Sequence, residues 1–240
     1  MRILRRIWSG ALWSAIAISS QSQAQAAPQA DRTSPFCSYR NYHHVIPRIL
    51  GKQVVSEVRA FPARVVDKQR LAVSKLANLN LGRDELGRHN LFVPLNEAGE
   101  AYGVLRIHSE PGDHGLVFFA IFLNRKLGLQ DYRLLQYRGS AKEWLSTNTA
   151  LRNRIRGADA SKLRSWLDER GTGVSAKGLK ALGLEGETDR NLRSVVHLLR
   201  IAVKVIHSTD LVWGPRLRAI NFIEPRTPET AKKALKAPGK

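Results

Sequence analysis

Strand-like and helix-like hydrophobic patterns lie in separate parts of this chain, and this separation constrains the fold more than any single motif. From residue 63 to residue 137, short apolar runs alternate with turn residues at roughly ten-residue spacing, which is typical of an antiparallel meander. After Gly139 the apolar residues recur at helical spacing. Together with a helical pattern before residue 63, this order predicts an α+β fold with an N-terminal helix, an antiparallel β-meander and a helical C-terminal half packed on the sheet.

The individual elements follow from the same periods. The first helix is expected over residues 45–58, where Pro47 can occupy the first turn. The expected strands are residues 63–66, 71–74, 91–95, 101–108, 116–123 and 127–137. The expected later helices are residues 141–151, 161–169, 175–182 and 190–206. In the strand over 101–108, period two places Tyr102, Val104 and Arg106 on one face. Asp189 is the expected cap of the last helix, and residues 211–214 are expected to be extended.

Residues 1–26 have the three-part pattern of a secretory signal peptide. Arg2, Arg5 and Arg6 form a cationic start, residues 7–18 are mostly apolar, and residues 24–26 give the small-x-small cleavage pattern. The apolar run is shorter than the roughly 20 residues that span a bilayer, so a retained anchor is the second interpretation. We expect a periplasmic protein with a flexible lead-in over 27–44, a single domain over 45–224 and a basic mobile tail over 225–240.

The chain is strongly basic, with a formal charge of +19 that falls to +16 without the signal peptide. A charge of this size favours anionic partners, such as a phosphate-bearing cofactor, an acidic protein or an anionic envelope surface. Export argues against nucleic acid as the partner. Because the positive charges are scattered through every segment, a generally cationic, solvated surface is the alternative interpretation.

The residue types present exclude several kinds of chemistry and give only weak support to others. Cys37 is the only cysteine, so neither an intramolecular disulfide nor a cysteine-rich zinc site can form. Neither a Gly-x-Ser-x-Gly nor a Ser-x-x-Lys motif occurs, and residues 171–177 lack the glycine that a P-loop places before its lysine. A turn collects His108, Glu110, Asp113 and His114, which could ligate a metal, although turns gather polar residues in any case. We assign no catalytic residue and no metal ligand.

The order of the predicted elements over a longer stretch resembles that of a known domain family. The helix that ends in residues 61–66 leads into a meander with the stretch 96–104, then the strand over 127–137 and a helix at residues 143–145. This arrangement, over roughly residues 48–210, resembles the FMN-binding domain found in flavin-carrying subunits of sodium-pumping NADH:quinone reductases, related electron-transport complexes and nitrous-oxide-reductase regulators. The resemblance implies an FMN-binding-like domain over 45–224.

In that family a Ser-Gly-Ala-Thr motif precedes a helix, and the threonine carries FMN through a phosphodiester. The best match here is residues 185–188, in which Gly186 and Thr188 agree with the motif and two glutamates depart from it. Residues 170–175 are the alternative, with Thr172 as the second candidate for attachment. An ordinary helix-start residue is the competing interpretation of Thr188.

The resemblance implies an exported protein that acts in periplasmic electron transfer or as a redox accessory, with FMN as cofactor and a membrane-bound or periplasmic redox protein as partner. Such a protein need not be an enzyme with a substrate of its own. The alternative is a non-catalytic periplasmic binding or assembly module that keeps the fold and has lost the flavin. Its cationic surface would then dock an acidic partner or an anionic envelope polymer.

Overall fold

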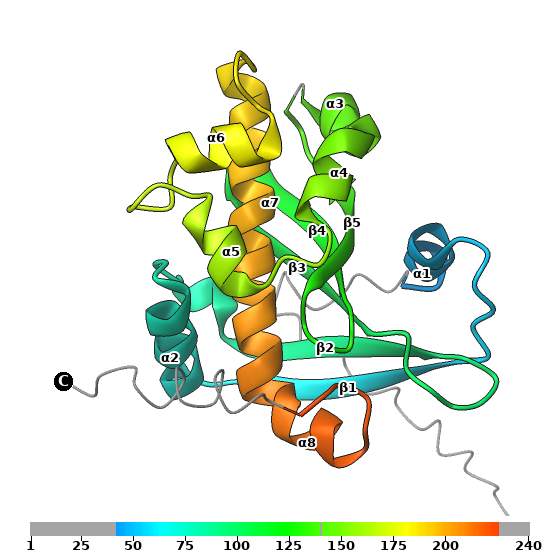
Figure 1. The fold of residues 1–240 in the computed structure, drawn as a ribbon. Helices are drawn as coiled ribbons and strands as arrows, with labels where there is room; N and C mark the ends of the chain where they lie inside the picture. Colours follow the sequence, from blue (N-terminus) through cyan, green and yellow to red (C-terminus); the bar gives the residue numbers. More distant parts are fainter. Residues whose placement is uncertain (1–41, 140, 226–240) are drawn as a thin grey trace, which may run out of the picture. The chain divides into compact units, whose positions relative to one another are not determined.

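The strands form one antiparallel sheet whose order follows the chain, β1-β2-β3-β4-β5 (Figure 1). The structure is a computed structural model, and it describes residues 42–139 and 141–225. The strands are β1 (Glu57–Val65), β2 (Gly87–Leu95), β3 (Val104–Gly112), β4 (Gly115–Leu123) and β5 (Leu129–Gln136). Each strand pairs with the next, so the meander expected from the period-two pattern is confirmed.

Helices precede and follow this meander. They are α1 (Tyr42–Leu50), α2 (Asp67–Ala77), the short η1 (Arg83–Glu85), α3 (Lys142–Thr147), α4 (Thr149–Ile155), α5 (Ala160–Ser165), α6 (Ala176–Leu182), α7 (Asp189–Ser208), the π-helical turn η2 (Thr209–Trp213) and α8 (Gly214–Ala219). Apart from α2 and η1, the described helices lie before the first strand or after the last one. The expected α+β class is confirmed.

Different helices cover the two faces of the sheet. On one face, α7 contributes residues such as Leu199 to a large buried core that also contains Phe119 of β4. On the other face, Val45 of α1 belongs to a smaller core with Phe92 and Leu105. Because successive side chains of a strand point to opposite faces, each inner strand can supply both cores.

Helix α7 is the longest helix and crosses the sheet (Figure 1). Its apolar face is buried along most of its length, which explains why the helical period is strongest there. The π-helical turn η2 joins it to α8. Trp213 in this turn donates a hydrogen bond from Nε1 to the Phe61 carbonyl oxygen at 2.7 Å, which fixes the end of α7 against β1.

Near the N-terminus, the expected helix is present with other bounds, and one expected strand is wrong. The helix expected over residues 45–58 begins at Tyr42 and ends at Leu50, after which β1 already starts at Glu57. The strand expected over residues 71–74 is part of α2. The spacing of Leu71 and Val73 suggested alternation, but Leu71 is 54% exposed, and Val73 is buried together with Ala77 at the i+4 position of a helix.

Two details at the ends of α7 also differ from expectation. The cap is Thr188, because its hydroxyl accepts a backbone hydrogen bond, and Asp189 is the first helical residue. Residues 211–214 are not extended, since the helix continues through η2 into α8.

Other expectations fall outside the described residues. These are the signal peptide over 1–26, most of the lead-in, Cys37, and the tail beyond residue 225. Over residues 42–139 and 141–225, no helix combines the length and the apolar character needed to cross a membrane.

Candidate functional site

A hollow of about 450 Å³ lies between α1, β5 and the segment formed by α3 and α4. We call it the basic pocket. It is lined by His44, Val45, Arg48, Arg133, Leu134, Leu135, Ser146 and Arg152. Three of these lining residues are arginines and one is a histidine, whereas none is a carboxylate. The pocket therefore offers a positively charged surface to a ligand.

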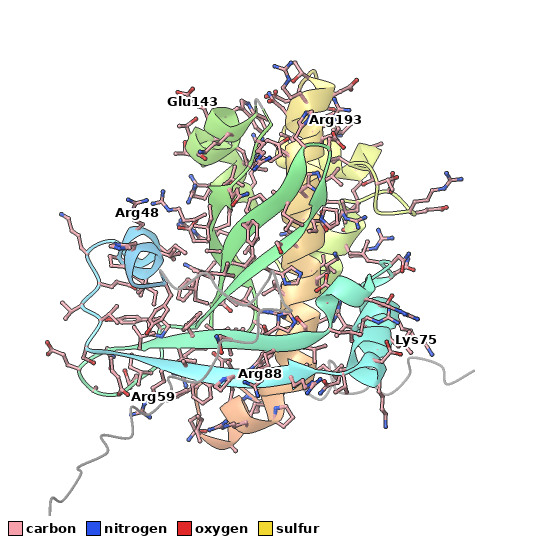
Figure 2. The ribbon with its side chains drawn as sticks, turned by 180° about the vertical axis from the view of Figure 1, so that it is seen from behind. Arg48, Arg59, Lys75, Arg88, Glu143 and Arg193 are labelled. Atoms are coloured by element: carbon pink, nitrogen blue, oxygen red, sulfur yellow. The ribbon has the colours of Figure 1, made fainter. Side chains whose placement is uncertain are left out.

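Arg133 ties α1 to the sheet at this pocket. Its Nη2 donates a hydrogen bond to the backbone oxygen of Arg48 at 2.6 Å, close to the C-terminal end of α1. Its Nε is buried and has no hydrogen-bond partner among the described residues. The side chain of Arg48 itself is exposed and projects from α1 (Figure 2). An anionic ligand could therefore accept hydrogen bonds from both guanidinium groups.

Arg152 is held differently. Its Nη1 donates to Asp131 Oδ1 at 2.6 Å and to the Tyr132 carbonyl oxygen at 3.1 Å, and its guanidinium lies 4.7 Å from the centre of the Tyr132 ring. Asp131 partly neutralises this arginine and fixes its position. The uncompensated positive charge of the pocket is thus concentrated on Arg48 and Arg133.

The dimensions and walls of the basic pocket suit a small organic anion. Ligand sites in proteins have volumes of about 300–1,000 Å³ and combine apolar walls with a few placed polar groups. Val45, Leu134 and Leu135 supply the apolar wall, and the arginines supply the polar groups. These are features that the phosphate and the apolar part of an organic anion would require.

A second polar region lies in the core, between β3 and α7. We call it the buried charge cluster, and it consists of Glu85, Arg106, His108, Glu110, His197, Arg200, Lys204 and Ser208. Charged side chains are seldom fully buried unless they are paired. Its members come from η1, one face of β3 and one side of α7, so it connects three elements that are distant in the sequence.

Lys204 is the centre of the buried charge cluster. Its Nζ lies 3.2 Å from Glu85 Oε1 and 3.1 Å from Glu110 Oε2. Glu85 also contacts His108 Nε2 at 3.1 Å, while Glu110 accepts a hydrogen bond from His197 Nδ1 at 2.7 Å. A continuous chain of ion pairs and hydrogen bonds therefore runs from the core to the half-buried His197.

The carboxylates of this cluster are ionised at neutral pH. Burial alone would raise the pKa of Glu110, but His197, Lys204 and Arg200 outweigh it and lower that pKa to about 2. Burial would also raise the pKa of Glu85. Its neighbours His108, Lys204 and Arg106 outweigh this effect and hold that pKa well below its ordinary value. Positive neighbours thus stabilise both negative charges inside the core.

Thr188, the first candidate for flavin attachment, caps α7. Its hydroxyl oxygen accepts a hydrogen bond from Asn191 N at 3.3 Å. Gly186 lies in the preceding turn with a φ of 82°, and Glu187 accepts a hydrogen bond from Asn191 Nδ2 at 2.7 Å. Carboxylates at Glu185 and Glu187 would face a phosphodiester at Thr188, so the residues here fit a helix cap better than a flavin phosphate. Attachment at this position stays a prediction.

Thr172, the second candidate, lies in the loop between α5 and α6. Its backbone N–H donates to Asp168 Oδ1 at 2.8 Å, and its hydroxyl donates to Asp168 Oδ2 at 3.1 Å. The carbonyl oxygen of Gly171 accepts a hydrogen bond from Arg200 Nη1 at 2.8 Å, which anchors this loop on α7. Thr172, Gly186 and Thr188 do not line the basic pocket.

The polar turn over residues 108–114 is divided between core and surface. His108 and Glu110 belong to the buried charge cluster, where they contact different partners. Asp113 is exposed and lies 3.8 Å from Arg193 Nε. Within residues 42–139 and 141–225, no three His, Cys, Asp or Glu side chains are arranged to hold a metal ion.

Sequence reasoning does not identify either the basic pocket or the buried charge cluster as a unit. One signal for the cluster was present, since period two places Arg106, His108 and Glu110 on the same face of β3 as Val104, which is buried. Lys204 is a second signal, because it interrupts the apolar face of α7. The pocket leaves no comparable pattern, because α1 and β5 are distant in the sequence.

In comparisons with known proteins, the chain matches no protein-family model, no curated protein and no solved structure.

Proposed function

We propose that this protein is an exported binding protein whose basic pocket holds a phosphate-bearing ligand of nucleotide size, with FMN as the first candidate. A bound flavin would supply the ability to accept and donate electrons. The protein would then act in periplasmic electron transfer or as a redox accessory. Its partner would be a membrane-bound or periplasmic redox protein.

The observation that carries this proposal is the charge of the basic pocket. Arg48 and Arg133 border a hollow of about 450 Å³, and Arg133 Nε is buried with no hydrogen-bond partner among the described residues. A phosphate oxygen is a strong acceptor for a guanidinium.

The residues of the pocket would divide the work of binding. Arg48 and Arg133 would bind the phosphate, and Arg152, positioned by Asp131, would orient it. The apolar side chains Val45 and Leu134 would exclude water from one side of the ring. None of these roles requires a nucleophile or a general base, which agrees with a protein that binds and does not catalyse a reaction by itself.

Fluorescence titration of the full chain with FMN and with riboflavin tests the proposal, because riboflavin lacks only the phosphate. We expect FMN to bind more tightly than riboflavin by about tenfold or more, as one lost charge-assisted contact implies. The Arg133→Gln variant should remove this difference. The control variant is Arg64→Gln, since Arg64 is exposed on β1 and lies outside the pocket.

Two results would contradict the proposal. One is equal affinity for FMN and riboflavin in the unaltered protein. The other is an Arg133→Gln variant that binds FMN as tightly as the Arg64→Gln control. Circular dichroism of all three proteins would show that a loss of binding does not reflect a loss of folding.

A second candidate is a binding or assembly module without flavin, which docks an acidic partner or an anionic envelope polymer. The observation in its favour is that the Thr188 hydroxyl is engaged as a helix cap beside Glu187. Intact mass measured after acid denaturation of periplasmic protein, made in a host with the flavin-attaching enzyme, tests covalent attachment, while the FMN titration tests noncovalent binding. A mass equal to that of the bare mature chain contradicts covalent attachment at Thr188, and an added FMN mass contradicts the module without flavin.

A further inference from the structure

His44 is the one described lining residue of the basic pocket whose charge can change near neutral pH. It lies on α1, one helical turn before Arg48, and both residues line the pocket. A histidine side chain changes charge between about pH 5 and pH 8, whereas an arginine stays protonated. The positive charge of the pocket therefore depends on the protonation state of His44.

The charged groups around His44 come from each element that borders the pocket. Helix α1 contributes Arg48, β5 contributes Arg133 and α4 contributes Arg152, while the described lining residue of α3 is an uncharged serine. Asp131 of β5 is engaged by Arg152 Nη1 at 2.6 Å. A protonated His44 would thus add a cation to a site whose described lining residues include no carboxylate.

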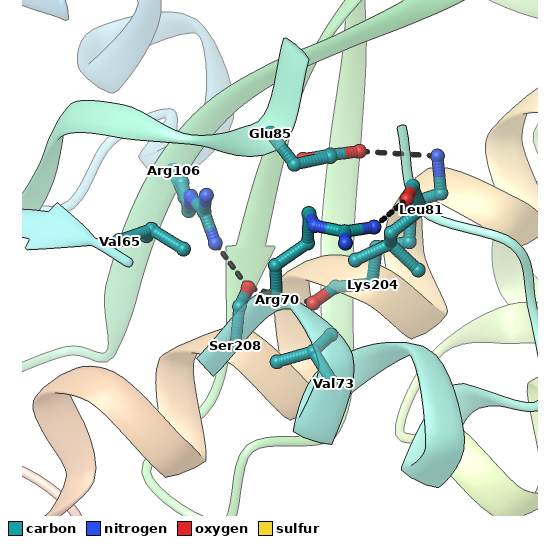
Figure 3. Close-up of a pocket in the computed structure, with 8 residues that line it drawn as sticks. All are labelled: Val65, Arg70, Val73, Leu81, Glu85, Arg106, Lys204 and Ser208. Carbon is teal, nitrogen blue, oxygen red and sulfur yellow. Dashed lines mark hydrogen bonds and ion pairs between the residues drawn. The ribbon is translucent and has the colours of Figure 1, made fainter. Parts of the chain in front are cut away.

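Histidines of the core are in a different situation, because carboxylates hold them. His108 contacts Glu85 at 3.1 Å, and Glu85 also contacts Lys204 (Figure 3). His197 pairs with a second buried carboxylate. Within residues 42–139 and 141–225, the ion pairs that involve a histidine are those of His108 and His197. Protonation in the core therefore acts on existing ion pairs, whereas protonation of His44 acts on the charge of the pocket.

We propose that the basic pocket binds its phosphate-bearing ligand more tightly as the pH falls, because His44 takes up a proton when the anion binds. This inference rests on the proposed function, since it requires an anion in the pocket. A bound anion favours the imidazolium over the neutral imidazole, and the imidazolium in turn strengthens binding of the anion. Protonated His44 then acts together with Arg48 and Arg133 on the phosphate.

Fluorescence titration of the full chain and of the His44→Gln variant with FMN tests this coupling. We expect the ratio of the two Kd values, variant over unaltered protein, to rise by about fivefold to tenfold between about pH 8 and about pH 5.5. Comparing the two proteins at each pH removes the ionisation of the FMN phosphate itself, which also titrates in this range. The control is His114→Gln, because His114 is exposed on the turn between β3 and β4 and is not a lining residue.

Calorimetric titration in two buffers of different ionisation enthalpy measures the proton directly. At about pH 6.5 the unaltered protein should take up a larger fraction of a proton for each FMN bound than the His44→Gln variant does. The His114→Gln control should match the unaltered protein. Equal proton uptake in the unaltered protein and in His44→Gln would overturn the proposal.

Failure of this coupling is distinguishable from failure of the proposed function. If FMN and riboflavin bind equally well at every pH, the pocket holds no phosphate, and both proposals fall. If FMN binds more tightly than riboflavin but the ratio of Kd values stays constant from about pH 8 to about pH 5.5, the phosphate site stands and the role of His44 falls. Circular dichroism at each pH would show that all three proteins remain folded during the titrations.

Discussion

The basic pocket and the buried charge cluster both contain several cationic side chains, but most of these cations are paired with carboxylates only in the cluster. In the cluster, Lys204 lies between Glu85 and Glu110, and nearly every charge has an opposite partner within contact distance. In the pocket, Arg48 and Arg133 face a hollow with no carboxylate among its described lining residues. Buried charges that form ion pairs hold the elements they join in place, whereas unpaired arginines near solvent can bind an anionic ligand.

This difference assigns separate roles to the two regions. The cluster joins η1, β3 and α7, so it fixes the long helix on the sheet. The pocket lies beside α1 and β5, and its lining residues Val45 and Leu135 also belong to the smaller core. Substitutions should therefore affect stability strongly in the cluster and ligand binding strongly in the pocket.

The largest effect is expected for Lys204→Met. It leaves Glu85 and Glu110 buried without their shared cation, and breaking a buried pair in this way costs about 3–5 kcal/mol. Urea unfolding measures the change, with Lys177→Met on the exposed surface of α6 as the control. A loss no larger than that of the control would show that the cluster does not hold α7 in place.

The pH dependence of stability should be the next largest effect. The pKa of Glu110 is about 2 in the folded protein against an ordinary 4.5, so its stabilisation is present above pH 4.5 and is lost as the pH falls towards 2. By linkage this loss is on the order of 3 kcal/mol. Urea unfolding across this range should show it, and Glu110→Gln should flatten the profile. An unchanged profile in this variant would contradict the assignment.

His89 should also make the protein less stable as the pH falls, but it should do so at a higher pH than Glu110. Burial, with Arg106 and His108 nearby, lowers the pKa of His89 to about 3 from 6.5. The unfolded chain therefore binds a proton that the folded chain does not, and stability should already begin to fall as the pH drops below about 6.5. The His89→Gln variant should lose this part of the profile and keep the part due to Glu110.

Ser208→Ala should have a moderate effect. It removes the acceptor of Arg106 Nη1 and leaves a buried charged donor unpaired, which costs about 1–3 kcal/mol. Ser146→Ala is the matched control, because Ser146 is exposed at the basic pocket and should change stability by less than about 0.5 kcal/mol. If chemical unfolding shows the same loss of unfolding free energy in both variants, the cluster is no more important for stability than the pocket, which would contradict the account.

The smallest effect on stability is expected for Arg48→Gln. Arg133 bonds to the backbone oxygen of Arg48, so this contact survives the substitution, and the free energy of unfolding should change by less than about 0.5 kcal/mol. Affinity for FMN should nevertheless fall by about tenfold. A variant that is destabilised but binds FMN normally would reverse the roles of the two regions.

The sequence predicts the fold where local pattern and burial agree. Strands β2 to β5 follow from short apolar runs between turn residues, and helix α7 follows from the helical period of its buried face. Helix α2 was missed because Leu71 and Val73 mimic alternation, while the pair formed by Asp67 and Arg70 supports a helix at i,i+3 spacing.

The candidate sites were harder to predict because they depend on contacts between distant segments. Arg133 and Arg48 meet across 85 residues, and Lys204 and Glu85 meet across 119. A local period can place Arg106 on the buried face of β3, but it cannot identify the partner on α7. Nor can it separate an arginine that is matched in the core from one that faces a hollow.

The most direct test of the central claim is a crystal structure of the full chain grown with excess FMN. We predict phosphate density within hydrogen-bonding distance of the guanidinium groups of Arg48 and Arg133, with the flavin ring against Val45 and Leu134. Flavin density joined to Thr188 or Thr172, or an empty basic pocket at saturating FMN, would contradict the account.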